Sequence, residues 1–458
     1  MRRYDSPGSE AVYLARTLRR ALPCAVVTAA ILFQMGAVTS AVAQVVGESR
    51  TRIHDPEAEA LQKLLVDAQA ALDQKDYSTA VQKYQEYLAK KPDDAAVHFQ
   101  LGYTFTALRR PNDAKPEYAR AVELDPKMGP AYLNLGMTLV ELNDPNAAIE
   151  PLQKAAELGP NDAHPKFLLG LACERAGKLP EAIEQFQAAE KLDDKDPDVH
   201  IELGRVLLSS NRPADAEPEF RAAIALRPEA APAHLGLAQS LIAEKKPDDA
   251  AIELDSYLKS QPNDSEARIE RASLLVDAGK YDDALAELDR AAAPKPESLR
   301  SLKLRAEALL NLNRYADAIP VLQRAASLDP HDAQVAAALG HAYVEKKDYP
   351  NAIRALSVAL QMNPKSDEAL TDLINAQYST KNYQAALQNI DILAQRKELP
   401  VGSWFVRATC YDRLGEIQQA VDAYEKFLQL NKDQNSDMYF GATERVRFLK
   451  RELEQKKR

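Results

Sequence analysis

An alanine recurs every 34 residues along most of this 458-residue chain, and the frame never slips. If the alanine is given position 20 of a 34-residue unit, it fills that position in eleven consecutive units. These residues are Ala80, Ala114, Ala148, Ala182, Ala216, Ala250, Ala284, Ala318, Ala352, Ala386 and Ala420. Strict recurrence over so many units predicts a fold built by stacking one small motif rather than by enclosing one large core.

Other positions of the same frame are also restricted. Position 8 is glycine or alanine in ten units, with Ile374 as the exception, and position 32 is proline in eight units. Position 24 is often aromatic, and position 27 is alanine in seven units. Position 34 is aspartate or serine in seven units: Asp94, Asp162, Asp196, Asp264, Ser298, Asp332 and Ser366.

These residue types predict two antiparallel helices in each unit. Small side chains at positions 8 and 20 let two helices approach closely, while bulky residues at position 24 fill the space beside the crossing. Proline at position 32 cannot continue a helix and therefore ends the second one. Aspartate or serine at position 34 is a good N-cap for the first helix of the next unit.

This pattern resembles the tetratricopeptide repeat (TPR) family, whose 34-residue unit has small residues at 8, 20 and 27, an aromatic at 24 and proline at 32. The resemblance covers residues 61–434 without insertion. It implies an all-α fold, a right-handed superhelical solenoid of helix-turn-helix repeats, with somewhat more than one superhelical turn. Glu398 and Lys432 replace the proline in the last two units, which predicts looser or differently angled packing there, as does Ile374.

The segments outside the repeats are short. Residues 1–43 combine a basic stretch ending at Arg20 with an apolar run that closes on Ala41-Val42-Ala43, which predicts a signal peptide cleaved before Gln44. The alternative is an uncleaved N-terminal membrane anchor. Residues 44–60 form a polar linker, and 435–458 predict a capping helix with an apolar stripe of Val446, Leu449 and Leu453 and a basic tip.

Composition narrows the range of partners and chemistry. The formal net charge is −10, and removal of the arginine-rich residues 1–43 makes it more negative, so nucleic-acid binding is not expected. Cys173 and Cys410, the cysteines beyond the expected signal peptide, are too few and too far apart for a disulfide framework, so we expect no disulfide.

No constellation of residues indicates a catalytic site, a metal site or a cofactor. His98, His200 and His234 all occupy position 4, in different units, and we interpret them as packing residues because no histidine and cysteine stand at metal-ligand spacing. The glycines at position 8 lie inside helical patterns, so none of them is expected to form a phosphate-binding loop. We therefore expect no enzyme.

The resemblance places the first helix of each unit on the inner wall of the superhelix, with positions 2, 5, 9, 12 and 13 facing the groove. Six apolar side chains occupy positions 5 and 9 of units two to four and form the candidate peptide-binding groove: Phe99, Tyr103, Leu133, Met137, Phe167 and Leu171. The alternative is that they pack between repeats. Further along, positions on the wall become charged, as at Arg300 and Lys303.

Together these features predict an exported, non-catalytic scaffold that binds protein or peptide partners through the groove in the periplasm or outside the cell. If the N-terminal segment is not cleaved, that segment would hold the protein at a membrane. The alternative function is an accessory subunit of a complex that synthesises or exports envelope polysaccharide or lipid.

Overall fold

The computed structural model describes residues 56–292, 297–433 and 436–456 of the chain. These residues form 23 α-helices and no strand. Each repeat contributes two helices joined by a tight turn, and a further helix follows the last repeat. The expected signal peptide, residues 1–43, and most of the expected linker lie outside the described residues.

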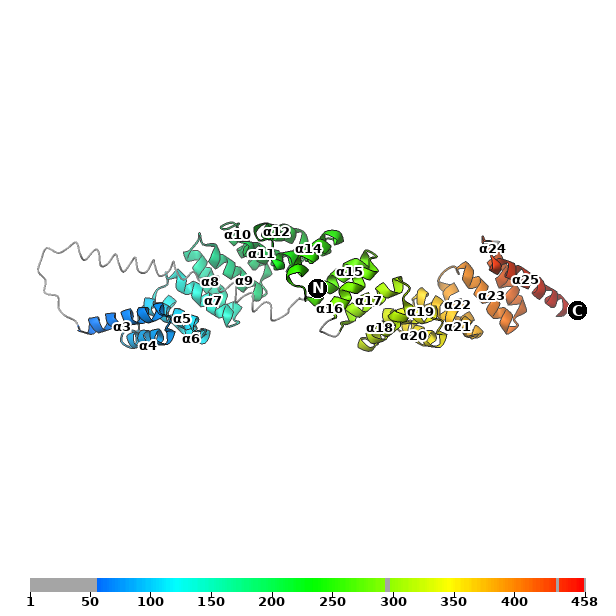
Figure 1. Ribbon diagram of the computed structural model, residues 1–458, viewed down its shortest axis with the longest axis horizontal. Helices are drawn as coiled ribbons and strands as arrows, with labels where there is room; N and C mark the ends of the chain where they lie inside the picture. The colour runs from blue at the N-terminus through cyan, green and yellow to red at the C-terminus, as the bar shows by residue number, and fades with distance from the viewer. Residues whose placement is uncertain (1–55, 293–296, 434–435, 457–458) are drawn as a thin grey trace. The chain divides into compact units, whose positions relative to one another are not determined.

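The helices fall into two compact bodies, of which the first ends at Tyr257 and the second begins at Leu258. From α3 to α13 in the first body, and from α15 to α25 in the second, each helix packs against the next helix of the chain, as can be followed in Figure 1. Consecutive packing of this kind is the solenoid that the repeat predicts. The helices that begin in the first body are α3 (Pro56–Asp73), α4 (Tyr77–Leu88), α5 (Ala95–Ala107), α6 (Pro111–Leu124), α7 (Gly129–Glu141), α8 (Pro145–Leu158), α9 (Ala163–Arg175), α10 (Leu179–Glu190), α11 (Pro197–Ser209), α12 (Pro213–Leu226), α13 (Ala231–Ala243) and α14 (Pro247–Ser260).

The second body continues the same alternation of first and second helices. Its helices are α15 (Ser265–Asp277), α16 (Tyr281–Ala291), α17 (Leu299–Asn311), α18 (Tyr315–Leu328), α19 (Ala333–Glu345), α20 (Tyr349–Met362), α21 (Asp367–Ser379), α22 (Tyr383–Arg396), α23 (Val401–Leu414), α24 (Ile417–Leu430) and α25 (Asp437–Lys456).

The helix crossings are as close as the small residues predict. All eleven alanines at position 20 have an exposed fraction of 0 %. At position 8, a Cβ added to Gly136 would lie 2.4 Å from the Leu152 side chain, and one added to Gly170 would lie 2.7 Å from the Phe186 ring. The bulky residue at position 24 therefore fills the space beside the glycine of the facing helix.

Helix ends follow the expected chemistry. All seven predicted N-cap residues accept a hydrogen bond from a backbone N–H in the first turn of the following helix, and Asp94, for example, accepts from Val97 N at 3.2 Å. The second helix ends two residues before the proline at Pro126, Pro160 and Pro330. Proline and cap together set a short connection between repeats.

The turn inside each repeat has one backbone conformation throughout. Position 15 lies in the left-handed region in all eleven repeats. Glycine occupies it only three times, as Gly177, Gly279 and Gly415 with φ between 71° and 80°. Asparagine, lysine or arginine occupies it in the other repeats. A left-handed backbone conformation is less favourable for these residues than for glycine, and the packing of the two flanking helices must compensate for this strain.

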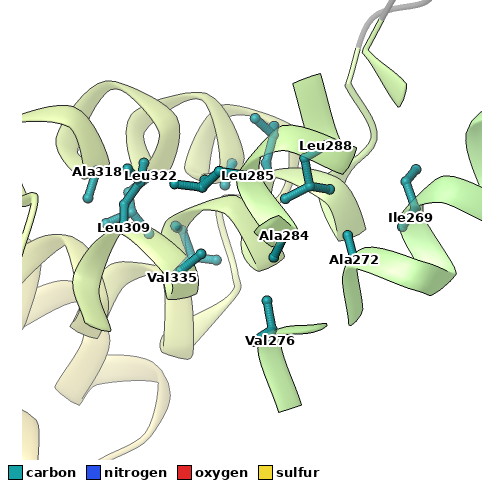
Figure 2. Packing of buried hydrophobic residues seen from close by; sticks show 14 of the residues in the cluster. Ile269, Ala272, Val276, Ala284, Leu285, Leu288, Leu309, Ala318, Leu322 and Val335 are labelled. Carbon is teal, nitrogen blue, oxygen red and sulfur yellow. The ribbon is translucent and has the colours of Figure 1, made fainter. Parts of the chain in front are cut away.

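Apolar side chains of neighbouring repeats share continuous cores. In the second body one cluster joins residues of α15 to α19, and Figure 2 shows Leu285, Leu309 and Leu322 pointing into the space between their helices. Ala284 and Ala318, the position-20 residues of two successive repeats, lie in the same cluster. Since each repeat completes the core of its neighbour, no single repeat encloses a core of its own.

The last repeats bury apolar side chains although several positions of the frame are altered there. Ile374, the large residue at position 8, is only 2 % exposed and packs in a cluster with Ile390 at position 24 and with Leu393 and Leu399. The larger side chain of Ile374 is buried because β-branched Ile390 leaves room that an aromatic side chain would occupy, and a different helix packing in the last repeats stays a prediction.

The helix after the last repeat has one buried stripe. Val446 and Leu449 of α25 are buried and Leu453 is partly buried, and all three lie in a cluster with Tyr424 and Phe427 of α24. This stripe covers apolar side chains that a twelfth repeat would otherwise cover. None of the described helices combines the length and the apolar character needed to cross a bilayer.

Candidate functional site

The six apolar residues of the predicted groove divide into two groups. Phe99, Phe167 and Leu171 are buried, with exposed fractions of 5 %, 6 % and 8 %. The ring of Phe99 lies 5.9 Å from that of Tyr118, and the ring of Phe167 lies 5.7 Å from that of Phe186, both centroid to centroid. These three side chains belong to the packing of the repeats, as the alternative interpretation held, and offer little surface to a ligand.

Tyr103 of α5 and Leu133 and Met137 of α7 are partly exposed. The two helices are the first helices of neighbouring repeats, and they contact each other directly. We call these three residues the apolar patch. Because they lie one helical turn apart on α7 and at the equivalent position on α5, they share one face of the first body.

Ion pairs join the first helices of neighbouring repeats in the second body. Arg300 bonds to Glu270 at 2.8 Å, and His341 bonds to Asp372 at 2.9 Å. Lys303 reaches Asp332, the N-cap of the next first helix, also at 2.8 Å. Arg300 and Lys303, which the sequence suggested as charged positions of the wall, are therefore each paired with a carboxylate at a repeat junction.

A denser cluster of charges lies between α9 and α11 in the first body. Arg205 donates to both carboxylate oxygens of Glu174 and to Glu202, whose exposed fraction is only 3 %. Burial by itself would lower the pKa of the Arg205 guanidinium, but the charges of Glu202 and Glu174 outweigh that effect and raise it. Two carboxylates at a repeat junction thus share the Arg205 guanidinium, and removal of this cation is expected to destabilise the junction.

The histidines at position 4 make a recurring contact. The Nδ1 atom of each ring bonds to a glutamate at position 23 of the same repeat, and the Nε2 atom bonds to the backbone carbonyl at position 32 of the preceding repeat. These contacts are His98 with Glu117 and Pro92 O, His200 with Glu219 and Asp194 O, and His234 with Glu253 and Pro228 O. Arg268 makes the same two contacts, with Glu287 and Pro262 O.

Sequence reasoning assigned these histidines to packing and missed their partners. The pairing was visible in the sequence, because glutamate stands at position 23 in each repeat with histidine or arginine at position 4 and in no other repeat. Each such contact ties the first helix both to its own second helix and to the connection before it. Each histidine serves a different repeat.

The two cysteines are small core residues. Cys173 and Cys410 are buried free thiols, and they lie in different bodies. Burial raises the pKa of the Cys410 thiol to about 12 and also raises that of Cys173. Thiols held in the neutral form are poor nucleophiles, so neither offers a reactive group.

Comparisons with known proteins agree with this geometry. The family model described as "Cilia and flagella-associated protein 70 C-terminal domain", a TPR model, matches residues 13–275. The model "Tetratricopeptide repeat" matches residues 269–333, and "Anaphase-promoting complex, cyclosome, subunit 3" matches residues 345–427. The chain belongs to the tetratricopeptide repeat family. No curated protein matches it.

Several solved structures are similar in fold. The crystal structure of MamA protein is 23 % identical and covers 38 % of this chain and 95 % of its own, with a TM-score of 0.36. YrrB, titled a TPR protein with an unusual peptide-binding site, is 20 % identical and covers 40 % and 95 %, with a TM-score of 0.37. Yeast Tom70 is 14 % identical and covers 87 % and 97 %, with a TM-score of 0.32. The similarity extends to the fold alone.

Proposed function

We propose that the protein is a non-catalytic scaffold that binds a protein or peptide partner on the inner wall of its first body. The observation that carries the proposal is the apolar patch of Tyr103, Leu133 and Met137, which is partly exposed on adjoining first helices. Apolar side chains in such a position favour an apolar segment of a partner. Arg300, Lys303 and His341 of the second body support this choice of surface, because each is already paired with a carboxylate.

The test replaces all three residues of the apolar patch with serine and compares capture of partners from an envelope extract with that by the unchanged protein. We expect the captured partner to be lost, since truncation of a central apolar anchor commonly costs about 2 kcal/mol or more of binding free energy. Circular dichroism melts must first show that the triple variant unfolds cooperatively. Identification of the partner then separates a general scaffold from an accessory subunit, which would retain a transferase or an export component.

The matched control reverses the charges of Arg300 and Lys303 in the second body. This variant should capture the partner at full strength. Loss of capture in this variant, together with retention in the apolar-patch variant, would move the binding surface to the second body. Serine at Phe99 or Phe167 is unsuitable for this purpose, because those buried rings support the repeats themselves.

We further propose that the protein is exported and acts in the periplasm or outside the cell. Support comes from the basic stretch, the apolar run and the Ala41-Val42-Ala43 sequence of residues 1–43. Intact-mass measurement of the protein from its native cells should give a chain that begins at Gln44. A chain that keeps Met1 and sediments with membranes would show an anchor instead.

A further inference from the structure

One of the three histidine contacts has an additional carboxylate. Around His200 of α11 stand Glu219 of α12 and Glu190, the last residue of α10, and one ligand atom from each of the three lies within 4.8 Å of the other two. Glu190 occupies position 28 of the repeat before His200. The same position is Leu88 in the repeat before His98 and Ile224 in the repeat before His234. The histidine and its glutamate are therefore a feature of several repeats, whereas this group of three belongs to one repeat junction.

The imidazole of His200 is oriented as a metal ligand would be. Its Nε2 atom lies 3.1 Å from the carbonyl oxygen of Asp194, and a ring nitrogen that donates to a backbone carbonyl leaves the other nitrogen available for coordination. That other nitrogen, Nδ1, donates to Glu219 at 2.8 Å, and a metal ion bound between the two atoms would displace its proton. The side chain is only 7 % exposed, so its orientation is fixed by its surroundings.

The charges around the ring favour a cation. Two carboxylates crowd one site, because one carboxylate oxygen each of Glu190 and Glu219 lies within 4.8 Å of the other and of a ring nitrogen of His200. Glu219 pairs with His200, whereas Glu190 has no ion pair with a basic residue in the part of the chain that the structure describes. A divalent ion between the two carboxylates would neutralise them more completely than one imidazolium does.

We propose that Glu190, His200 and Glu219 bind one divalent transition-metal ion, which joins α10, α11 and α12 across a repeat junction. One imidazole nitrogen and two carboxylate oxygens form a ligand set that suits Zn²⁺ and, with lower affinity, Co²⁺. Three protein ligands leave coordination positions for water. The ion stabilises this junction of the first body and has no part in the binding surface proposed above.

The experiment titrates the metal-stripped full-length chain, made without a polyhistidine tag, with Zn²⁺ in a calorimeter. One ion should bind per chain, and Co²⁺ should give visible absorption bands that saturate at the same ratio. Hydrogen exchange should slow on metal addition in α10, α11 and α12, because a ligand that binds only the folded state stabilises the part that holds it.

His200→Arg is the decisive variant, because the chain itself shows that arginine can replace histidine in this contact. Arg268 bonds to Glu287 and to Pro262 O as His200 bonds to Glu219 and Asp194 O. The variant should therefore melt like the unchanged protein yet bind no metal. Glu190→Leu, which copies the equivalent Leu88, should also abolish binding.

His234→Arg is the matched control and should leave Zn²⁺ binding unchanged. Ile224→Glu supplies the missing carboxylate beside His234 and Glu253, and a folded variant should bind a second ion. The proposal is overturned if the His200→Arg chain binds Zn²⁺ as the unchanged chain does, or if the unchanged chain binds none.

Discussion

Arg205→Met should lower the free energy of unfolding of the first body by about 2–3 kcal/mol. The substitution removes the cation that contacts both Glu174 and the buried Glu202, and breaking a buried pair by removing one partner typically costs about 3–5 kcal/mol. The expected value lies below that range because the Arg205 side chain is 41 % exposed and water screens part of the charge. Urea denaturation followed by circular dichroism measures the change.

A surface ion pair in the next helix provides the control. Arg212 bonds to Asp215 at 2.7 Å, but both side chains are about half exposed, so Arg212→Met should cost about 0.5 kcal/mol or less. Glu202→Gln should recover part of the loss when combined with Arg205→Met, since it removes the buried charge. Equal effects of Arg205→Met and Arg212→Met would contradict the buried-pair account.

Ala148→Leu should destabilise the protein by about 1–3 kcal/mol, because the larger side chain has no space at the crossing of α7 and α8. Ala148 is fully buried there, and the facing helix brings Gly136 against Leu152 with no room for even one more carbon atom. Stability in a solenoid is a sum over neighbouring repeats, so the loss should be concentrated near the substitution. Hydrogen exchange should therefore rise in α7, α8 and α9 before it rises elsewhere.

Ala147→Leu offers a control on the same helix, one residue away. Ala147 is exposed, and a surface substitution of this kind usually changes stability by no more than about 0.5 kcal/mol. A uniform rise in hydrogen exchange along all repeats of the Ala148→Leu variant would mean that the whole chain unfolds as one unit, contrary to the expectation.

Most of the fold could be predicted from the sequence because its determinants are local. Ala148 and the other alanines at position 20, the N-cap residues such as Asp94, and the proline at position 32 each act within a few residues of themselves or on the adjoining helix. Because these residues recur every 34 positions, the same pair of packed helices is repeated along the chain. Ile374 was harder to interpret, because its effect depends on the residue at position 24 of the facing helix, Ile390.

The inner wall was harder to predict because the frame gives the position of a residue but not the depth of its side chain. Position 5 holds both Phe99, which is buried against Tyr118, and Leu133, which is partly exposed. The difference arises from the neighbouring side chains, which the repeat does not fix. Whether the predicted groove residues bind a peptide stays a prediction, which the apolar-patch variant tests.

The polar contacts at repeat junctions were missed for a different reason. Each joins residues about 19 or 31 positions apart, such as His98 with Glu117 and Glu174 with Arg205. A scan for motifs at metal-ligand or catalytic spacing does not find such pairs. Comparison of the same positions in successive repeats finds the first kind, because glutamate stands at position 23 in each repeat that has histidine or arginine at position 4.

The ion pairs between neighbouring first helices also bear on how the chain avoids assembling in the wrong order. The alanine and glycine contacts are almost the same in every repeat. Apolar packing alone would therefore allow a repeat to pack against the second repeat after it, with the 34 residues between them looped out. The junctions differ in their charges: Arg205 meets Glu174 at one, Arg300 meets Glu270 at another, and Arg445 of α25 meets Asp412 at the last. A skipped repeat would leave these partners unmatched and partly desolvated, so the polar contacts distinguish the correct neighbour where the alanines cannot.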